Sequence, residues 1–372
     1  MELMLLLFVP LFWPLVAKAI WHHKITKLEI AINIGVVSVL VTCVYFAGLF
    51  HQTADTEVWN GVLTKKERVH GSYIRTYQCM CVQHCSGSGS SQSCHSSCQT
   101  CFEHHYTVMW DAETSIGGIQ FAHLDWTSRR VYDQPDPAAY VKASIGDPVA
   151  TERSFTNYVK AVPDSLFHEL SIAHAAEEIP AYPRVHNFYQ IDRVLNVESV
   201  VPLEAQQTLD SRLDLALRSL GKEKEVNVIV FLTEIDDPNY RYAVEKAWLG
   251  GKKNDVVVFI GLDGLTITWV DVMTWARNIG NEYFHVTLRD TLLTNKTFDA
   301  IMFSEQIIKA VEEQYDRPRM RDFEYLKKEI SPPTWLIGLA FVLGLGGSVG
   351  LSVLLARNAH EDFTQRYRTS SH

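Results

Sequence analysis

Three long apolar stretches lie at the two ends of the chain and frame a middle of ordinary mixed polarity. Residues 30–50 and 334–356 are uncharged, and residues 1–20 carry only one acid and one base, near their ends. Runs of about 20 apolar residues match the thickness of a bilayer. The pattern therefore predicts three transmembrane helices, and residues 1–20 can also be interpreted as a signal-like segment.

The distribution of lysines orients these spans. Lys18–Lys27, between the first two stretches, holds three lysines and no acid, which is typical of a cytoplasmic loop. With three spans, residues 357–372 then form a cytoplasmic tail, and residues 51–333 lie on the extracytoplasmic side. We expect an integral membrane protein of the bacterial inner membrane, with the lipid bilayer as its first partner.

The region between the second and third stretches begins with short runs that alternate apolar and polar side chains. The alternation is clearest at Ser72–Tyr77, Tyr106–Trp110 and Ile119–Leu124, which are separated by glycine, proline and serine. A period of two with β-branched and aromatic residues predicts strands. We therefore expect a β-rich domain at 57–162, interrupted by a cysteine cluster at 79–101.

Six of the seven cysteines lie in that cluster: Cys79, Cys81, Cys85, Cys94, Cys98 and Cys101. An even number of cysteines outside the cytoplasm indicates three disulfides, and six cysteines allow fifteen pairings. The same thiolates, with nearby histidines, would also suit Zn²⁺. The spacing leaves both interpretations open, since only Cys98 and Cys101 have the Cys-x-x-Cys form.

A second soluble domain is expected at 189–316, after a linker helix within 163–188. Two apolar runs of strand length, Val226–Leu232 and Val256–Gly261, flank a stretch with helical spacing at Tyr240–Trp248. Strand, helix and strand in this order predict a right-handed βαβ unit with parallel strands. The fold class of this domain is therefore α/β.

The flanking segments extend this α/β domain. A strand is expected at Leu195–Val201, and Pro202 then begins an amphipathic helix that Gly221 ends as its C-cap. After the βαβ unit, Leu265–Val272 alternates like a strand, and Phe298–Gln314 has the spacing of a closing helix.

The order of these elements resembles the TPM domain, a family of membrane-tethered, extracytoplasmic α/β domains with a sandwich fold. The matching residues are Tyr242-Ala243, Trp248, Gly251-Lys252-Lys253-Asn254-Asp255 and Val256–Gly261. The resemblance implies a TPM-like fold over about 189–315, and metal binding or acid phosphatase activity. The chain departs from the family at Val270-Asp271-Val272, where a Gly-x-Gly turn is usual. The first soluble domain is similar to uncharacterised membrane proteins of large tailed phages, which implies no activity.

Acidic side chains follow both strands of the expected βαβ unit: Glu234, Asp236, Asp237 and Asp263. Ligands of parallel sheets collect beyond the carboxyl ends of the strands, and Ca²⁺ or Mg²⁺ prefers oxygen ligands. The four carboxylates are therefore a candidate metal site. The alternative is that Asp236 and Asp237 form a turn before the helix, and that Asp263 begins a hairpin turn.

Charge and motifs exclude several classes of function. A net charge of −9 without a dense Lys/Arg face argues against a nucleic-acid partner. The one Gly-x-Ser-x-Gly pattern, at Gly346–Gly350, lies inside the third apolar stretch and is no nucleophile elbow, and we find no Ser/His/Asp order that would indicate a hydrolase triad. Gly346 and Gly350 in the glycine-rich third span have the spacing that lets membrane helices approach closely. They predict pairing with other membrane proteins or with a second copy.

These observations predict a membrane-anchored scaffold or modulator of membrane or envelope assemblies, without catalytic residues and without a certain cofactor. The first alternative is a metal-dependent phosphatase that uses Glu234, Asp236, Asp237 and Asp263. The second alternative is a zinc-stabilised binding module, in which the clustered cysteines are ligands.

Overall fold

The computed structural model describes residues 2–21, 25–86, 93–162, 179–186, 189–275 and 280–369. The chain divides into two compact units. The first, here called the membrane unit, holds Met1–Asp55, Ser154–Leu170 and Arg319–His372. The second, here called the sheet unit, holds Thr56–Arg153 and Ser171–Pro318. Of the predicted linker helix at 163–188, the structure describes only 179–186, which is not helical, and the rest lies outside the described residues.

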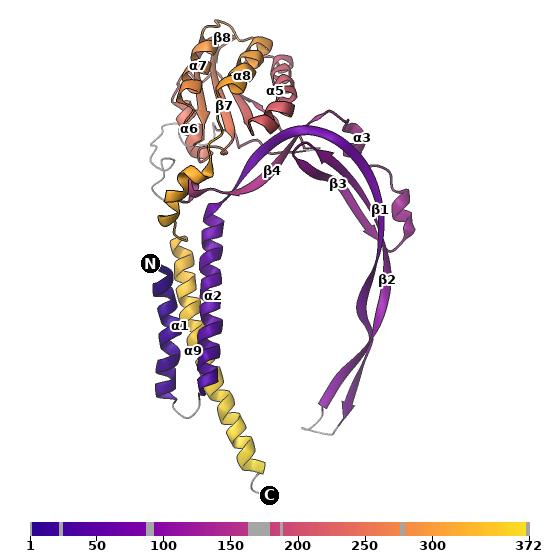
Figure 1. The fold of residues 1–372 in the computed structure, drawn as a ribbon, viewed down its shortest axis with the longest axis vertical. Coiled ribbons are helices and arrows are strands. Elements are labelled where there is room, and N and C mark those ends of the chain that lie inside the picture. The colour runs from indigo at the N-terminus through magenta and orange to yellow at the C-terminus, as the bar shows by residue number, and fades with distance from the viewer. Residues whose placement is uncertain are drawn as a thin grey trace. The chain divides into compact units, whose positions relative to one another are not determined.

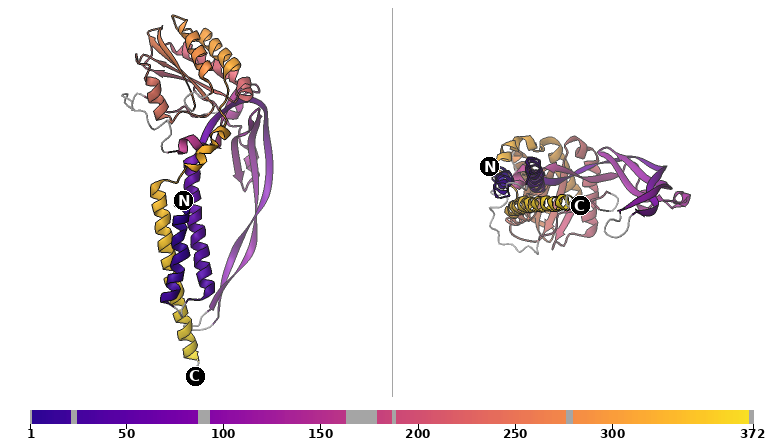
Figure 2. Two further views of the ribbon diagram at one scale, coloured as in Figure 1. Left: turned by 60° about the vertical axis from the view of Figure 1, so that its left-hand side comes forward. Right: turned by 90° about the horizontal axis from the view of Figure 1, so that it is seen from below.

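Three long helices form the membrane unit: α1 (Glu2–Ile20), α2 (Lys27–Thr53) and α9 (Thr334–Thr369). All three lie side by side in both figures (Figures 1 and 2). Each is long and apolar enough to cross a membrane. In α9, the part with this length and composition is Thr334–Arg357. The three predicted spans are thus confirmed as helices of the required length and composition. Beyond its apolar part, α9 continues as a helix into the predicted tail.

Polar and small side chains join α2 to α9. The buried side chain of Asn33 donates to the carbonyl oxygen of Ser348 and to Oγ of Ser352, both over 3.0 Å. Oγ of Ser348 donates back to Asn33 over 3.1 Å. A buried amide in an apolar bundle must find such partners, because leaving it unpaired costs several kcal/mol. This contact fixes the register of α2 against α9.

The predicted glycine motif does not contribute to that contact. A Cβ atom built on Gly344 would lie 3.2 Å from Val41, whereas a Cβ on Gly346 or Gly350 would meet no atom within 4 Å. The two motif glycines therefore leave room on the outside of the bundle. Their pairing with another membrane helix stays a prediction.

Short elements cap the end of α2 within the membrane unit. Asn157 precedes α4 (Tyr158–Ala161), and its backbone N–H donates to the carbonyl of Thr53 over 2.7 Å. Its side chain donates to Asp55 over 2.8 Å. The 3₁₀ segment η4 (Met320–Lys328) places Lys327 Nζ 5.0 Å from the centre of the Tyr158 ring.

The first sheet has the strand order β3-β2-β1-β4. Its strands are β1 (Ala54–Ser86), β2 (Ser93–Thr114), β3 (Gly117–Trp126) and β4 (Pro148–Thr156). β2 is antiparallel to both β1 and β3. The predicted β-rich domain is thus a sheet with two strands far longer than the usual 3–10 residues. In Figure 1, β1 and β2 run on together beyond the end of β3.

The part of this sheet nearest β3 has a small core. Trp110 and Val108 of β2 are fully buried against Val131 of the 3₁₀ segment η2 (Arg129–Asp133). Arg68 of β1 donates to the carbonyls of Tyr132 and Gln134 and thereby fastens this segment over the sheet. The short helix α3 (Ala138–Lys142) follows in the same covering loop. Further along the hairpin, the side chains on this face are exposed, as at Phe102 and Trp126.

The second sheet has the order β5-β6-β7-β8. Its strands are β5 (Val194–Val197), β6 (Asn227–Thr233), β7 (Asp255–Asp263) and β8 (Thr266–Thr274). β5, β6 and β7 are parallel, and β8 is antiparallel to β7. The predicted parallel βαβ unit is therefore confirmed, while a TPM-like fold stays a prediction.

Helices cover both faces of this sheet. α5 (Leu203–Glu223), α7 (Glu282–Leu293) and α8 (Ala300–Gln314) pack on one face, and α6 (Tyr240–Ala247) packs on the other. Neighbouring residues of β6 alternate between the two cores, so that both faces are apolar. This double cover explains why the strands are continuous apolar runs rather than alternating ones.

One expectation about this domain is wrong, and one of its helices was not expected. α5 does not end at Gly221 but continues to Glu223, and Lys224 is its C-cap. Gly221 is a glycine for another reason: a Cβ there would lie 2.5 Å from the backbone oxygen of Asn60. α7 was not expected, although its buried residues Phe284, Leu288 and Leu292 have helical spacing.

The aromatic core on the α6 side gives a stability test. Phe231 is fully buried and stacks on Phe259 with ring centres 4.8 Å apart. We expect Phe231→Ala to lower the free energy of unfolding by about 3–5 kcal/mol, because the cavity cannot close in a packed sheet. Urea unfolding of the purified full chain in detergent measures this. Tyr283→Ala, at a side chain that is 74% exposed, is the control and should leave the unfolding midpoint unchanged. Equal loss in both variants would contradict this packing.

Candidate functional site

The four carboxylates of the predicted metal site occupy turns after β6 and β7. Glu234 accepts a hydrogen bond from the backbone N–H of Val200 over 3.2 Å. Asp237 accepts the backbone N–H and the side-chain amide of Asn239, each over 2.9 Å. Asp236 is exposed. Asp263 is exposed too, in the hairpin between β7 and β8, where it pairs with Thr266.

The structure does not gather these carboxylates into a metal centre. Among the residues that the structure describes, no group of three or more His, Cys, Asp or Glu side chains could hold a metal ion. The bonds of Asp237 are those of a turn residue, which agrees with the alternative interpretation. Binding of Ca²⁺ or Mg²⁺ at these residues stays a prediction.

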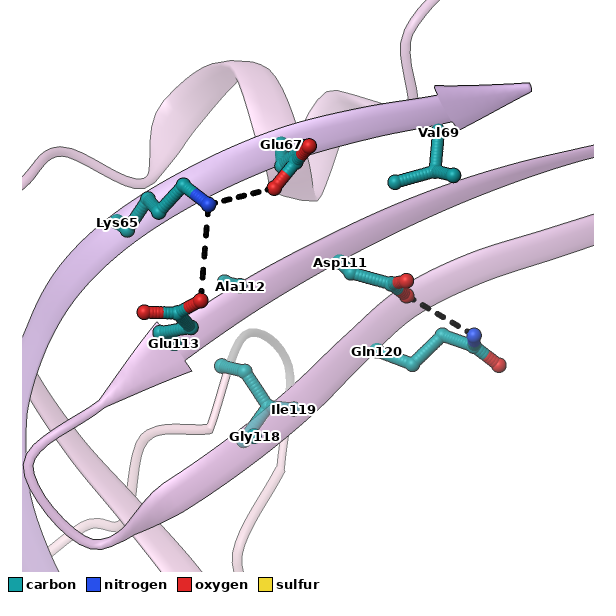
Figure 3. Close-up of a pocket in the computed structure, with 9 residues that line it drawn as sticks. All are labelled: Lys65, Glu67, Val69, Asp111, Ala112, Glu113, Gly118, Ile119 and Gln120. Atoms are coloured by element: carbon teal, nitrogen blue, oxygen red, sulfur yellow. Dashed lines mark hydrogen bonds and ion pairs between the residues drawn. The ribbon is translucent and has the colours of Figure 1, made fainter.

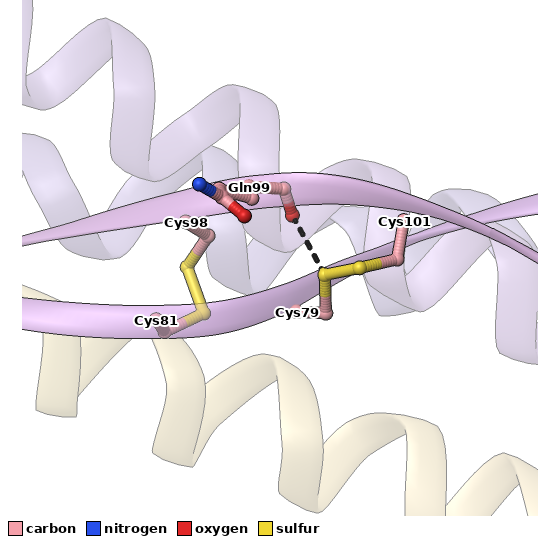
Figure 4. Close-up of a disulfide and its surroundings, with 5 residues drawn as sticks. All are labelled: Cys79, Cys81, Cys98, Gln99 and Cys101. Carbon is pink, nitrogen blue, oxygen red and sulfur yellow. Dashed lines mark hydrogen bonds between the residues drawn. A yellow bond between two sulfur atoms is a disulfide. The ribbon is translucent and has the colours of Figure 1, made fainter.

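All six clustered cysteines form disulfides across the hairpin of β1 and β2. The pairs are Cys79–Cys101, Cys81–Cys98 and Cys85–Cys94. Figure 4 shows two of these bridges between the neighbouring strands. A disulfide sulfur is not a thiolate, so these residues do not provide zinc ligands in this state. Disulfides are typical of an oxidising compartment outside the cytoplasm.

The bridges lie where no third strand among the described residues borders the hairpin. β3 ends at Trp126, which pairs with Tyr106, so that β1 and β2 continue from there as a ribbon of two strands. An isolated two-stranded hairpin is only marginally stable in water. Covalent bridges compensate for the missing core by restricting the unfolded chain. We call this part, Ser72–Ser86 with Ser93–His105, the stapled ribbon.

One face of the hairpin sheet is aromatic and uncovered beyond η2. Trp126 is 54% exposed, Phe102 70% and Ile74 58%. The strand register places these side chains on the same face as the buried Trp110, further along the hairpin. The ring of Tyr106 stacks on His104, with centres 4.6 Å apart. Exposed aromatic residues of this kind are common in protein interfaces.

The opposite face is polar and acidic. A shallow hollow of about 480 Å³ lies on it, and its charged lining residues are Lys65, Glu67, Asp111 and Glu113 (Figure 3). Lys65 Nζ lies 2.6 Å from Glu67 and 3.6 Å from Glu113. One cation thus offsets part of the charge of three carboxylates, which leaves the lining of the hollow with a net negative charge.

Further along this acidic face, His105 sits between two carboxylates. Its Nδ1 lies 2.7 Å from Asp125 and its Nε2 lies 3.2 Å from Glu103. Tyr73 stacks on its ring and donates to Asp125 over 2.6 Å. The hydrogen bond to Asp125 raises the pKa of His105 above 6.5, and the bonds from Tyr73 and His105 lower the pKa of Asp125. The cluster joins β1, β2 and β3 where the ribbon begins.

The other end of the hairpin is fixed by buried charges within the sheet unit. Glu57 of β1 is 3% exposed and accepts hydrogen bonds from Arg317 over 2.5 Å and from Trp59 over 2.8 Å. Nζ of Lys253 lies 3.6 Å from the same carboxylate. Burial lowers the pKa of Lys253, and Glu57 opposes that shift. Removing one partner of such a group typically costs about 3–5 kcal/mol.

Further polar and charged side chains complete this junction. Asn60 accepts a hydrogen bond from Arg193 over 2.6 Å and donates to the carbonyl of Val226 over 2.9 Å. Asp255 at the start of β7 is buried and accepts the hydroxyl of Tyr182 over 3.0 Å. Burial raises the pKa of Asp255 to about 6, although its hydrogen bonds oppose the change. The junction therefore ties β1 to the edge where β6 and β7 begin.

The junction also gives a role to the residues that suggested the family resemblance. Asn254 donates to the carbonyl of Val58 over 2.6 Å, and Lys252 donates to Thr56 over 3.1 Å. Sequence reasoning missed the function of this run in joining the two sheets, although its density of polar residues beside a buried strand was a usable signal. A loop that only faces solvent would not require so many side chains that can donate hydrogen bonds.

Comparison of the chain with protein-family models, with curated proteins and with solved structures finds no match.

The disulfides predict a local effect of reduction. In the reduced protein, or in a Cys81→Ser/Cys98→Ser variant, we expect proteases to cut within the stapled ribbon, because each bridge contributes about 2–4 kcal/mol. The α/β domain should stay protected, since its cores do not involve cysteines. Limited proteolysis of the full chain with mass spectrometry of the fragments measures this. Cys43→Ser is the control, because Cys43 is a free thiol. First cuts within β6 or β7 would contradict the expectation.

The His105 cluster predicts a pH-dependent contact. A raised folded-state pKa means that the histidine stabilises the contact below pH 6.5 and that this contribution is lost as pH rises through the folded pKa. Because the pKa of Asp125 is lowered from 3.8, the contribution of this carboxylate to the contact is lost only as pH falls below 3.8. The protection factors of the amides at residues 103–107 and 123–126, in which the intrinsic exchange rate at each pH is divided out, should thus be larger at pH 5.5 than at pH 8.5. His105→Gln should abolish the difference, while His95→Gln should keep it. The same difference in His105→Gln would refute the assignment.

Proposed function

We propose that this protein is a membrane-anchored, non-enzymatic scaffold of the bacterial inner membrane that presents the stapled ribbon to other membrane or envelope proteins. The observation that carries the proposal is the combination of three disulfides with an uncovered aromatic face on a ribbon that has no core. A chain that needed only a stable fold would gain little from extending β1 and β2 past their core.

Stiffness is what the disulfides add to such an arm. A flexible arm loses conformational entropy when it binds, and each ordered side chain costs about 0.5–1.5 kcal/mol. A ribbon that is already held in its bound shape avoids much of that cost. Its exposed Phe102 and Trp126 are large, rigid side chains, and such residues often dominate the binding free energy of protein interfaces.

The junction at the other end of β1 supports the same function. Because Glu57 and Asn60 are held by buried partners on the α/β domain, the hairpin has a fixed direction relative to that domain. A load on the ribbon is then passed to the α/β domain through hydrogen bonds and ion pairs. This suits an assembly component better than a flexible tether.

The compartment follows from the cysteines and the spans. Disulfides persist in the periplasm and other oxidising spaces, and three helices have the length and composition to cross a membrane. We therefore propose that residues 51–333 are extracytoplasmic and that residues 357–372 are cytoplasmic. The resemblances to the TPM domain and to phage membrane proteins agree with an extracytoplasmic, membrane-tethered protein.

No observation favours the two alternatives over the scaffold. A phosphatase would need Glu234, Asp236, Asp237 and Asp263 to converge on a metal ion, and a zinc module would need reduced cysteines. Turnover of a generic phosphomonoester that is lost in Asp236→Ala would support the enzyme. Stoichiometric zinc in the purified protein would support the binding module.

Photo-crosslinking in intact cells tests the scaffold. A photoreactive amino acid at Phe102 or Trp126, both exposed on the aromatic face, should give discrete crosslinks to other membrane or envelope proteins. The same amino acid at Tyr283, on the exposed side of α7, is the matched control and should give few. Equal crosslinking at all three positions, or none at the ribbon, would contradict the proposal.

A further inference from the structure

Two histidines lie opposite each other on the stapled ribbon, beyond the end of β3. His84 of β1 and His95 of β2 are partners in the strand register. Residues that are directly opposite on antiparallel strands point to the same face of the sheet, so their side chains are neighbours. The centres of the two rings are 5.6 Å apart, and the ring planes differ by 32°. Both side chains are exposed, so that an ion can reach them from solvent.

The separation of these rings is close to that of two imidazoles on one metal ion. A Zn–N bond is about 2.0–2.1 Å long and the geometry is tetrahedral, so that the ring centres of two imidazole ligands lie about 5 Å apart. The 5.6 Å between His84 and His95 exceeds this value by little. A small rotation of either side chain is enough to bring one nitrogen of each ring to the same ion.

The sequence around the pair is free of competing charges. Residues 79–101 include no Lys, Arg, Asp or Glu, and apart from the bridged cysteines their only ionisable side chains are His84 and His95. Among the residues that the structure describes, the two imidazoles contact each other and form no hydrogen bond or ion pair. No basic side chain of this segment repels a metal ion, and the nitrogens of both rings are available to bind one.

The other histidines of the stapled ribbon are arranged differently. His105 has both ring nitrogens engaged by carboxylates. His104 faces Ile74 across the two strands, so that no second imidazole lies opposite it. In the described part of the ribbon, only His84 and His95 place two imidazoles at one position of the register.

Disulfides on both sides hold the histidine pair in place. The bridge Cys85–Cys94 joins the next residue along each strand. In the other direction, Cys81–Cys98 joins the residues that are three positions from each histidine. Strands fixed between two covalent bridges cannot move apart, so that the two imidazoles bind an ion with little further loss of conformational entropy.

We propose that His84 and His95 together bind one divalent transition-metal ion, of the class of Zn²⁺ and Cu²⁺, through one ring nitrogen of each imidazole. Imidazole is a preferred ligand of these ions, whereas Mg²⁺ and Ca²⁺ prefer oxygen. Water completes the coordination, because both side chains are exposed. The cysteines stay bridged, which separates this site from a zinc module with thiolate ligands. The inference goes beyond the scaffold function, because the ribbon binds the ion whether or not it binds a protein.

Metal titration of the full chain tests the site. Purified in detergent without a polyhistidine tag, the protein should bind one equivalent of Zn²⁺ more tightly than any further equivalents, as measured by isothermal titration calorimetry. His84→Asn and His95→Asn should each weaken this binding by about tenfold or more, because one imidazole alone cannot chelate the ion. The double variant should bind about as weakly as either single variant, since each single change already removes the chelate. With Cu²⁺ as the probe, electron paramagnetic resonance should show two nitrogen ligands in the wild type and fewer in each variant.

His104→Asn is the matched control, because it removes an exposed histidine of the same ribbon that has Ile74 opposite it. It should bind Zn²⁺ like the wild type. Thiol counting in denaturant should find one free thiol in each chain, that of Cys43, with and without the metal. Non-reducing electrophoresis checks that the three disulfides form in every variant.

Four results would overturn the proposal. They are a wild-type chain that binds no Zn²⁺, binding that persists in both single variants, an equal loss in His104→Asn, and sulfur ligands in the X-ray absorption spectrum of the bound zinc. In the first case the two histidines only stack their rings. The last result, together with additional free thiols, would instead support the zinc module with cysteine ligands.

Discussion

The buried carboxylate of Glu57 is the constraint on which the sheet unit depends. A charge that is 3% exposed must be neutralised, and Arg317 and Lys253 approach it from separate parts of the chain. Arg317 follows the last helix of the α/β domain, and Lys253 precedes β7. The hairpin can therefore leave the α/β domain only in the direction that keeps these ions together. Everything that the ribbon presents is placed by this contact.

A second constraint is that two strands cannot bury a core between them. Where η2 covers the sheet, Val108 and Trp110 provide apolar burial. Beyond Trp126 nothing comparable exists among the described residues, and covalent bonds replace packing. This exchange leaves aromatic side chains and strand edges free, because they are not used for stability. The disulfides thus make the hairpin rigid, and they also allow its aromatic side chains to stay exposed.

Much of the fold was predictable because its signals are local. The three spans follow from length and apolarity, and the parallel strands follow from apolar runs around Val226–Leu232 and Val256–Gly261. The turn at Asp263-Gly264 follows from the residue types, because glycine adopts a positive φ without strain, and φ is 61° at Gly264. The helix α7 was missed, although Phe284, Leu288 and Leu292 mark its buried face at helical spacing. Its burial depends on neighbours that are distant in sequence.

The sequence by itself determined three helices that are long and apolar enough to cross a membrane, the α/β strands and the supply of six cysteines in one cluster. Only the tertiary structure decided which cysteines pair, because pairing depends on the register of two strands and not on spacing. It also decided why Gly221 is a glycine and what Asn254 binds, since both answers lie on β1, more than a hundred residues earlier. Contacts between distant segments leave no periodic trace in either segment alone. That is the physical reason why the candidate site had to be found in space.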